Sequence, residues 1–235
     1  MPLKAAGLGA VLLIAHLGGF AWPLVFLYVA ALAVAYNTPL MHTTKYLASF
    51  VVLSVASALL ISRAPDARTA VLTVFLATVL WYIHAGIKNF FFIYRERWHY
   101  ACVVGISYEL LLVFFSSNHA GPFWIKAAFM FAALASVWHE YMRIQTEAEG
   151  GLSARYARVG GTVLALILVE AAWAIQLLPV AALQGANISM LVFLVASGAV
   201  RGRVTGGLVR WKILALISIC TFLIIFTLLA SSWAV

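Results

Sequence analysis

Charge is scarce in this chain of 235 residues: Asp, Glu, Lys and Arg together make up 9% of the sequence, whereas 65% of the residues are hydrophobic. In soluble domains about a quarter of the residues are charged. So few charges do not cover a water-facing surface, which excludes an ordinary soluble protein and predicts that lipid is the main solvent. No polar stretch is long enough to form a second domain, so we expect a single transmembrane domain over 1–235.

Acidic and sulfur-containing side chains are also rare. Asp66 is the only aspartate, which excludes the paired Asp-rich motifs that hold Mg²⁺ and pyrophosphate lipids. Cys102 and Cys220 have no metal-ligand spacing and form no disulfide framework. The zinc-binding His-Glu-x-x-His motif, the Gly-x-Ser-x-Gly elbow and the Gly-rich phosphate loop are missing as well. We therefore predict no cofactor and no metal. The residues present are those of a transporter, a scaffold or an unusual enzyme rather than those of a common hydrolase or transferase.

Basic residues outnumber acidic ones and give the chain a formal net charge of +8. They lie in short gaps between apolar runs, where topology determinants and contacts with anionic lipid headgroups belong. We therefore expect membrane lipids at the cytoplasmic face as partners, and no nucleic acid. Other membrane proteins or a second copy of the chain are further expected partners.

Apolar runs long enough for a bilayer-crossing helix, about 17 to 25 residues, recur along the sequence. They predict an all-α fold, a polytopic transmembrane bundle of about nine helices (eight or nine). Residues 5–36 contain a Gly-Gly-Phe-Ala-Trp-Pro turn signal, so we predict a hairpin of two short helices there, with one long tilted helix as the alternative. The nine predicted helices cover 5–19, 22–36, 46–62, 69–87, 100–116, 123–141, 159–178, 187–200 and 213–233.

The basic residues also predict the orientation of this bundle. With the N-terminus in the cytoplasm, twelve of the fifteen lysines and arginines fall in inner loops, and only Arg63, Arg68 and Lys126 lie outside. Such an excess is the positive-inside bias of membrane proteins. We therefore expect a multi-pass protein of the prokaryotic plasma (inner) membrane, with a cytoplasmic N-terminus and an external C-terminus.

Two carboxylates, Glu109 and Glu170, fall inside apolar runs. Each lies about ten residues from the inner end of its predicted helix, roughly 15 Å deep and near the bilayer midplane. One interpretation is a proton- or cation-binding pair facing a hydrated cavity, with at least one protonated residue. The other is a protonated glutamate that hydrogen-bonds a neighbouring helix for structural reasons. Hydroxyl groups expected at suitable depth belong to Ser54, Ser57, Thr78 and Thr221.

A second polar set lies at the predicted inner boundary. Residues four apart on a helix share a face, which pairs His84 with Lys88 and His139 with Arg143. One interpretation is a site for a phospholipid headgroup or a small anion; the other is ordinary snorkelling at helix ends. A b-type haem between the two histidines is a third alternative. The set of candidate binding residues comprises His84, Lys88, Asn89, His139, Glu140 and Arg143, with no residue assigned to catalysis.

The pattern Glu170-x-x-Trp173 followed by Pro179, with Gln176 between them and Arg201-Gly-Arg203 after the next run, resembles the C-terminal third of a small bacterial family of polytopic membrane proteins. The resemblance implies a helical membrane fold. No function is attached to that family, so it implies no activity and no site residue.

Three classes of function are consistent with these features. Proton- or cation-linked transport, or the handling of a small ligand or lipid within the bundle, predicts a polar interior around the two carboxylates. A non-catalytic scaffold or assembly subunit predicts a dry core and an apolar face for partners. An intramembrane lipid-modifying enzyme predicts that the inner polar set converges in a cleft. We rank them in that order.

Overall fold

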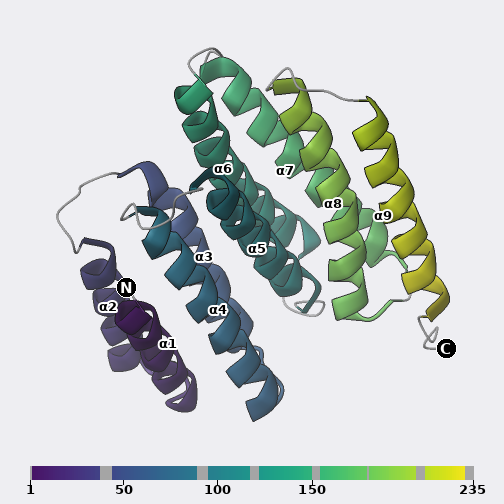
Figure 1. Ribbon diagram of the computed structural model, residues 1–235. Helices are drawn as coiled ribbons and strands as arrows, with labels where there is room; N and C mark the ends of the chain where they lie inside the picture. Colours follow the sequence, from purple (N-terminus) through teal and green to yellow (C-terminus); the bar gives the residue numbers. More distant parts are fainter. Residues whose placement is uncertain are drawn as a thin grey trace. The chain divides into compact units, whose positions relative to one another are not determined.

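The computed structural model describes residues 2–37, 44–88, 95–116, 122–149, 154–178, 180–204 and 210–230, and within these ranges it contains helices and no strands (Figure 1). The predicted all-α fold is therefore confirmed. Each predicted helix corresponds to one helix of the structure, and the ends agree to within five residues except in the sixth helix, which extends eight residues further, to Glu149. The described helices are α1 (Pro2–Leu17), α2 (Trp22–Asn37), the 3₁₀ turn η1 (Thr44–Tyr46), α3 (Leu47–Ile61), α4 (Ala67–Lys88), α5 (Arg95–Ser116), α6 (Phe123–Glu149), α7 (Ala154–Gln176), α8 (Ala182–Val204) and α9 (Arg210–Ala230).

Four helical segments within the described ranges are long and apolar enough to cross a membrane: Ala67–Lys88, Arg95–Ser116, Arg158–Gln176 and Ala182–Val200. Three shorter apolar helices, α1, α2 and α3, contain 15 or 16 residues each. At 1.5 Å per residue such a helix is about 24 Å long, less than the roughly 30 Å of a bilayer core. The count of nine spans and the orientation of the termini stay predictions.

A tight turn joins α1 to α2, as the Gly-Gly-Phe-Ala-Trp-Pro signal predicts. Gly19 adopts the left-handed conformation with a φ of +63°. The amide of Gly19 donates to the His16 carbonyl at 2.9 Å, and the amide of Phe20 donates to the Ala15 carbonyl at 2.8 Å. These two bonds form a Schellman motif, which ends a helix by satisfying its last carbonyl groups. The long tilted helix, the alternative for this region, is wrong.

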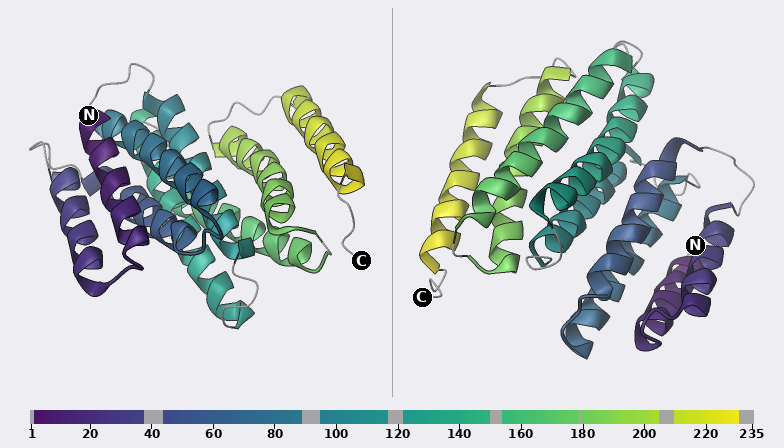
Figure 2. Two further views of the ribbon diagram at one scale, coloured as in Figure 1. Left: turned by 90° about the horizontal axis from the view of Figure 1, so that it is seen from below. Right: turned by 180° about the vertical axis from the view of Figure 1, so that it is seen from behind.

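The chain divides into two compact units, 1–109 and 110–235. In the first unit α4 packs against α1 and α3, while α1 also packs against α2 (Figure 2). Leu12, Leu53 and Trp81 from three different helices are almost fully buried and form its apolar centre. The polar side chains described below are placed by this packing.

In the second unit each of the helices α6 to α9 packs against the next one along the chain. The backbones of α6 and α7 approach each other closely at Gly161. A methyl group added there would lie 2.8 Å from the backbone nitrogen of His139 and 3.0 Å from the carbonyl carbon of Trp138. Only a glycine permits this approach, which resembles the small-residue contacts of membrane helices.

Candidate functional site

Glu109 is the buried acidic group of the first unit. Its relative exposure is 0%, in α5, and it faces the serine-bearing side of α3. The Ser57 hydroxyl lies 2.9 Å from the Glu109 Oε2 atom. Tyr28 of α2 also interacts electrostatically with this carboxyl. Ser57, one of the four hydroxyl-bearing residues expected at this depth, therefore contacts Glu109.

The second carboxyl oxygen of Glu109, Oε1, is buried and has no hydrogen-bond partner among the described residues. Among the residues that the structure describes, no lysine or arginine forms an ion pair with the Glu109 carboxyl. Buried polar atoms are nearly always paired, so an orphaned oxygen marks a place where a further group belongs. Oε1 is therefore the open position of this site.

Three serines line the buried side of α3. Ser49, Ser54 and Ser57 are all at most 2% exposed. The eight residues from Ser49 to Ser57 span about 12 Å along the helix. Around the middle one, the Tyr28 hydroxyl donates to the Ser54 carbonyl at 2.9 Å, and the Trp81 Nε1 atom donates to the Ser54 hydroxyl at 3.3 Å. Polar groups of α2, α3 and α4 therefore follow one another along the interior of this unit.

His84 lies at the other end of this row. Its Nε2 atom is 3.1 Å from the Ser49 hydroxyl and 3.0 Å from the Tyr46 carbonyl oxygen. The Tyr46 ring meets the His84 ring and the His99 ring edge-on, with centroids 6.1 and 5.1 Å away. Both histidines are 2% exposed. His99 of α5 is thus a buried neighbour of the predicted His84 site.

No periodicity in the sequence could have revealed this contact. His99 belongs to α5 and Tyr46 to the turn before α3, and the two meet only because the helices pack together. The described residues contain no group of three or more His, Cys, Asp or Glu side chains that could hold a metal ion.

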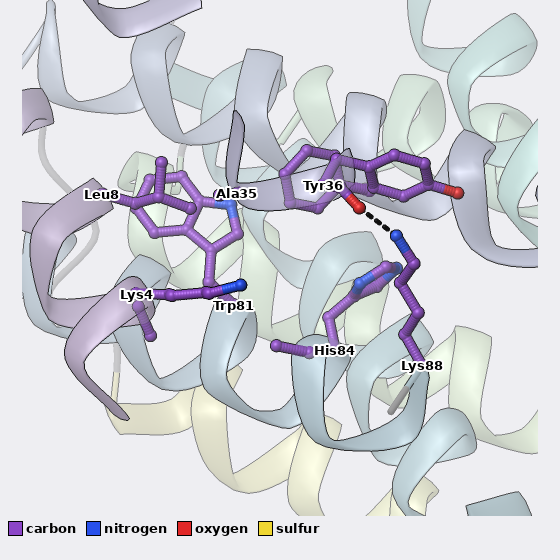
Figure 3. A pocket seen from close by; sticks show the side chains of 10 residues that line it. Lys4, Leu8, Ala35, Tyr36, Trp81, His84 and Lys88 are labelled. Carbon is purple, nitrogen blue, oxygen red and sulfur yellow. Dashed lines mark hydrogen bonds between the residues drawn. The ribbon is translucent and has the colours of Figure 1, made fainter. Parts of the chain in front are cut away.

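A small cavity opens beside His84 and is lined by residues of α1, α2, α3 and α4 (Figure 3). It offers about 20 Å³ to the centre of a water molecule, which is room for one water. Lys4 and Lys88 reach this cavity from α1 and α4. The Lys88 ammonium donates to the Tyr36 carbonyl and lies 3.6 Å from the centre of the Tyr36 ring. Lys88 is therefore positioned by both a carbonyl group and a π face.

The other predicted binding residues lie in the second unit. His139 is half-buried on α6 and interacts electrostatically with Arg143 and Arg158. Glu140 is 6% exposed. His84 and Lys88 belong to the first unit, and His139 and Arg143 belong to the second. A site shared by these two pairs of residues therefore stays a prediction. Asn89 lies outside the described residues.

Glu170 differs from Glu109 in its surroundings. It occupies an exposed position of α7, on a face with Leu166 and Trp173, which are 47% and 52% exposed. The expectation that Glu170, like Glu109, faces the interior is wrong, because depth along a helix does not determine which side of the helix is covered. The apolar neighbours of Glu170 turn to the same exposed side.

The helical fold, the low charge content and the four long apolar helices indicate a membrane protein. Comparison with known proteins adds no family: no family model, curated protein or solved structure matches this chain. The chemistry of its side chains is therefore the basis for assigning a function.

Proposed function

We propose that this is an integral membrane protein that takes up a proton or small cation at Glu109 and links that binding to transport or to the handling of a small ligand within the bundle. The observation that carries the proposal is the buried carboxyl with one oxygen held by Ser57 and the other without a partner among the described residues. An ionised carboxylate at mid-membrane depth costs about 3 kcal/mol or more, and such residues commonly mark proton or ion pathways.

The geometry around Ser57 favours a proton over a metal ion. The Ser57 hydroxyl lies 2.8 Å from the Leu53 carbonyl oxygen and 2.9 Å from Glu109 Oε2, but a hydroxyl has only one proton to donate. If Glu109 carries a proton, it donates to Ser57 while Ser57 donates to Leu53, and both contacts are hydrogen bonds. A divalent cation, in contrast, prefers six or more oxygen ligands.

A proton needs a route to a buried carboxyl, and the polar side of α3 offers one. In this proposal the proton enters at the cavity beside Lys88 and His84, where one water fits. Trp81 lines the same cavity and donates to Ser54, which precedes Ser57 by one helical turn. The Trp81 indole only donates and passes no proton, so in this proposal water carries the proton along the Ser54 and Ser57 hydroxyls to Glu109.

The test is an infrared difference spectrum of the purified protein in liposomes between neutral and alkaline pH. Wild type is expected to show the carbonyl band of a protonated carboxylic acid at neutral pH, and Glu109→Gln is expected to lack it. Ser57→Ala is expected to shift the band, because the acid loses its hydrogen-bond partner. Glu96→Gln, an exposed glutamate at the start of the same helix, is the matched control and should leave the band unchanged.

The same liposomes test the link to transport. With a pH-sensitive dye inside and a membrane potential applied, wild type is expected to conduct protons faster than Glu109→Gln. Identical spectra for wild type and Glu109→Gln would show that Glu109 does not hold the proton. Equal proton conduction by wild type and Glu109→Gln would show that Glu109 has no part in transport.

A second candidate function, an assembly subunit, is supported by a different residue. Glu170 is exposed between apolar side chains of α7, and a carboxyl group in that position gains from a hydrogen-bond donor on a partner helix. Disulfide crosslinking of Trp173→Cys in native membranes tests this candidate. A crosslinked partner or dimer that disappears when Glu170→Leu is added supports assembly, and an unchanged monomer contradicts it.

A further inference from the structure

An open apolar groove runs between α1 and α2, with a volume of about 450 Å³. Its walls are formed by small and branched side chains, among them Val11 of α1 and Ala31 and Val34 of α2. Gly7 lies in the α1 wall, and a methyl group added there would meet nothing within 4 Å. The groove is thus open at Gly7, and its volume is within the range of about 300 to 1,000 Å³ found for ligand sites.

The groove is basic at one end. Lys4 lines both the groove and the cavity beside His84, as do Leu8 and Ala35, so the two spaces adjoin. Lys88 enters the cavity from α4 (Figure 3). No aspartate or glutamate is among the residues that line either space. Two ammonium groups around one space repel each other, and an anion between them is attracted to both.

We propose that this groove binds an anionic phospholipid of the surrounding membrane, with one acyl chain along α1 and α2 and the phosphate at Lys4, where the groove adjoins the small cavity that Lys88 lines. A lipid supplies both parts that the site calls for: a hydrocarbon chain for an apolar channel and a negative phosphate for its basic end. A free phosphate would contact only the lysines, and a neutral lipid would fill the apolar groove without an ionic contact to the lysines.

This inference shares with the proposed proton route the cavity that Lys88 and His84 line, but it does not depend on Glu109. The groove and its lysines belong to α1, α2 and α4, whereas the Glu109 carboxyl is held from α3. The Glu109→Gln variant is therefore expected to bind the lipid as wild type does, even if it has lost its proton. Failure of one proposal leaves the other standing.

The experiment measures binding to the detergent-purified full chain by native mass spectrometry. The probes are phosphatidylglycerol, phosphatidylcholine with the same chains, glycerol phosphate and diacylglycerol. We expect phosphatidylglycerol to bind most tightly. Near a membrane surface each lysine contributes a factor of about five in affinity, so the variant with both Lys4→Gln and Lys88→Gln is expected to bind about 25-fold more weakly.

Filling the groove tests the acyl chain separately. Gly7→Phe occupies open space and leaves both lysines in place, and it is expected to weaken phosphatidylglycerol binding by at least tenfold. Matched controls are Lys45→Gln, which removes an exposed lysine outside the site, and Val29→Phe, which adds the same ring at an exposed position of α2 outside the groove. Both controls should bind as wild type does.

Two results would overturn the inference. Equal affinity for phosphatidylglycerol and phosphatidylcholine would remove the role of the lysines. Binding of glycerol phosphate as tight as that of phosphatidylglycerol, unaffected by Gly7→Phe, would make the site one for a free anion rather than a lipid. Circular dichroism melting of each variant checks its fold, and if the double lysine variant does not fold, the result with Gly7→Phe decides.

Discussion

The close approach of α6 and α7 at Gly161 leads to a quantitative prediction. In Gly161→Ala the new methyl carbon would lie 2.8 Å from the backbone nitrogen of His139, 3.0 Å from the carbonyl carbon of Trp138 and 3.1 Å from the Cα atom of His139. All three neighbours are backbone atoms. No side chain can rotate out of the way, so the two helices must move apart.

Two opposing effects determine the result. Alanine is more favourable than glycine inside a helix by up to about 1 kcal/mol. Overpacking a closely packed contact costs typically about 1 to 3 kcal/mol, and the backbone neighbours place Gly161 toward the upper end of that range. We therefore expect Gly161→Ala to lower the free energy of unfolding by about 1 to 2 kcal/mol.

Gly7→Ala is the matched control, because it makes the same chemical change in a helix where the methyl group meets nothing within 4 Å. Only the helix-propensity effect remains there, so Gly7→Ala is expected to raise stability by roughly 0.5 to 1 kcal/mol. The assay is reversible unfolding in mixed micelles, followed by circular dichroism, for wild type and both variants. A Gly161→Ala protein as stable as wild type, or two variants that shift in the same direction, would refute the argument from backbone contact.

Three further predictions concern the first unit. Ser57→Ala leaves the buried Glu109 carboxyl without its described hydrogen-bond partner. The variant is expected to lower the free energy of unfolding by about 1 to 3 kcal/mol. An unchanged unfolding curve would contradict the contact between Ser57 and Glu109. Gly19→Ala forces a side chain into a φ of +63° and is expected to cost about 1 kcal/mol in the same assay; a stabilised variant would argue against the Schellman turn. Asp66 accepts a hydrogen bond from the Thr69 amide at 2.7 Å, and this bond lowers the pKa of Asp66 below its ordinary value of 3.8. Because the folded pKa is the lower one, the stabilisation is present above pH 3.8 and is lost as the pH falls through the folded pKa. The protection of the Thr69 amide against hydrogen exchange, taken relative to its intrinsic rate at each pH, should fall over the same range. In Asp66→Ala this protection should not depend on pH there.

Local signals in the sequence were sufficient for the helices. Apolar runs predicted nine helical segments, and each one has a counterpart among the described helices; only the polar C-terminal extension of α6 to Glu149 was missed by more than five residues. The glycine pair and Pro23 predicted the turn between α1 and α2, because a left-handed residue ends one helix and a proline begins the next. These features depend on neighbours in the chain, so no packing information was needed.

The surroundings of the two carboxylates, Glu109 and Glu170, could not be predicted from the sequence alone. Glu109 and Glu170 lie at equal depth in their predicted helices, yet one is fully buried and the other is exposed. Nearly every neighbour of each residue is apolar, so hydropathy distinguishes no inward-facing side of α5 or α7. In water an apolar stripe marks the buried face of a helix, but in a membrane both faces are apolar and that signal is lost.

The sequence by itself determined that the chain is helical, roughly where each helix lies and that several helices are apolar enough for a membrane, because these follow from composition and from residues close together in the chain. Only the tertiary structure decided that Ser57 meets Glu109, that Tyr46 joins His84 to His99, and that Lys4 and Lys88 share one cavity. Those contacts join residues 38 to 84 positions apart in the chain, and they exist because packed helices bring distant side chains together.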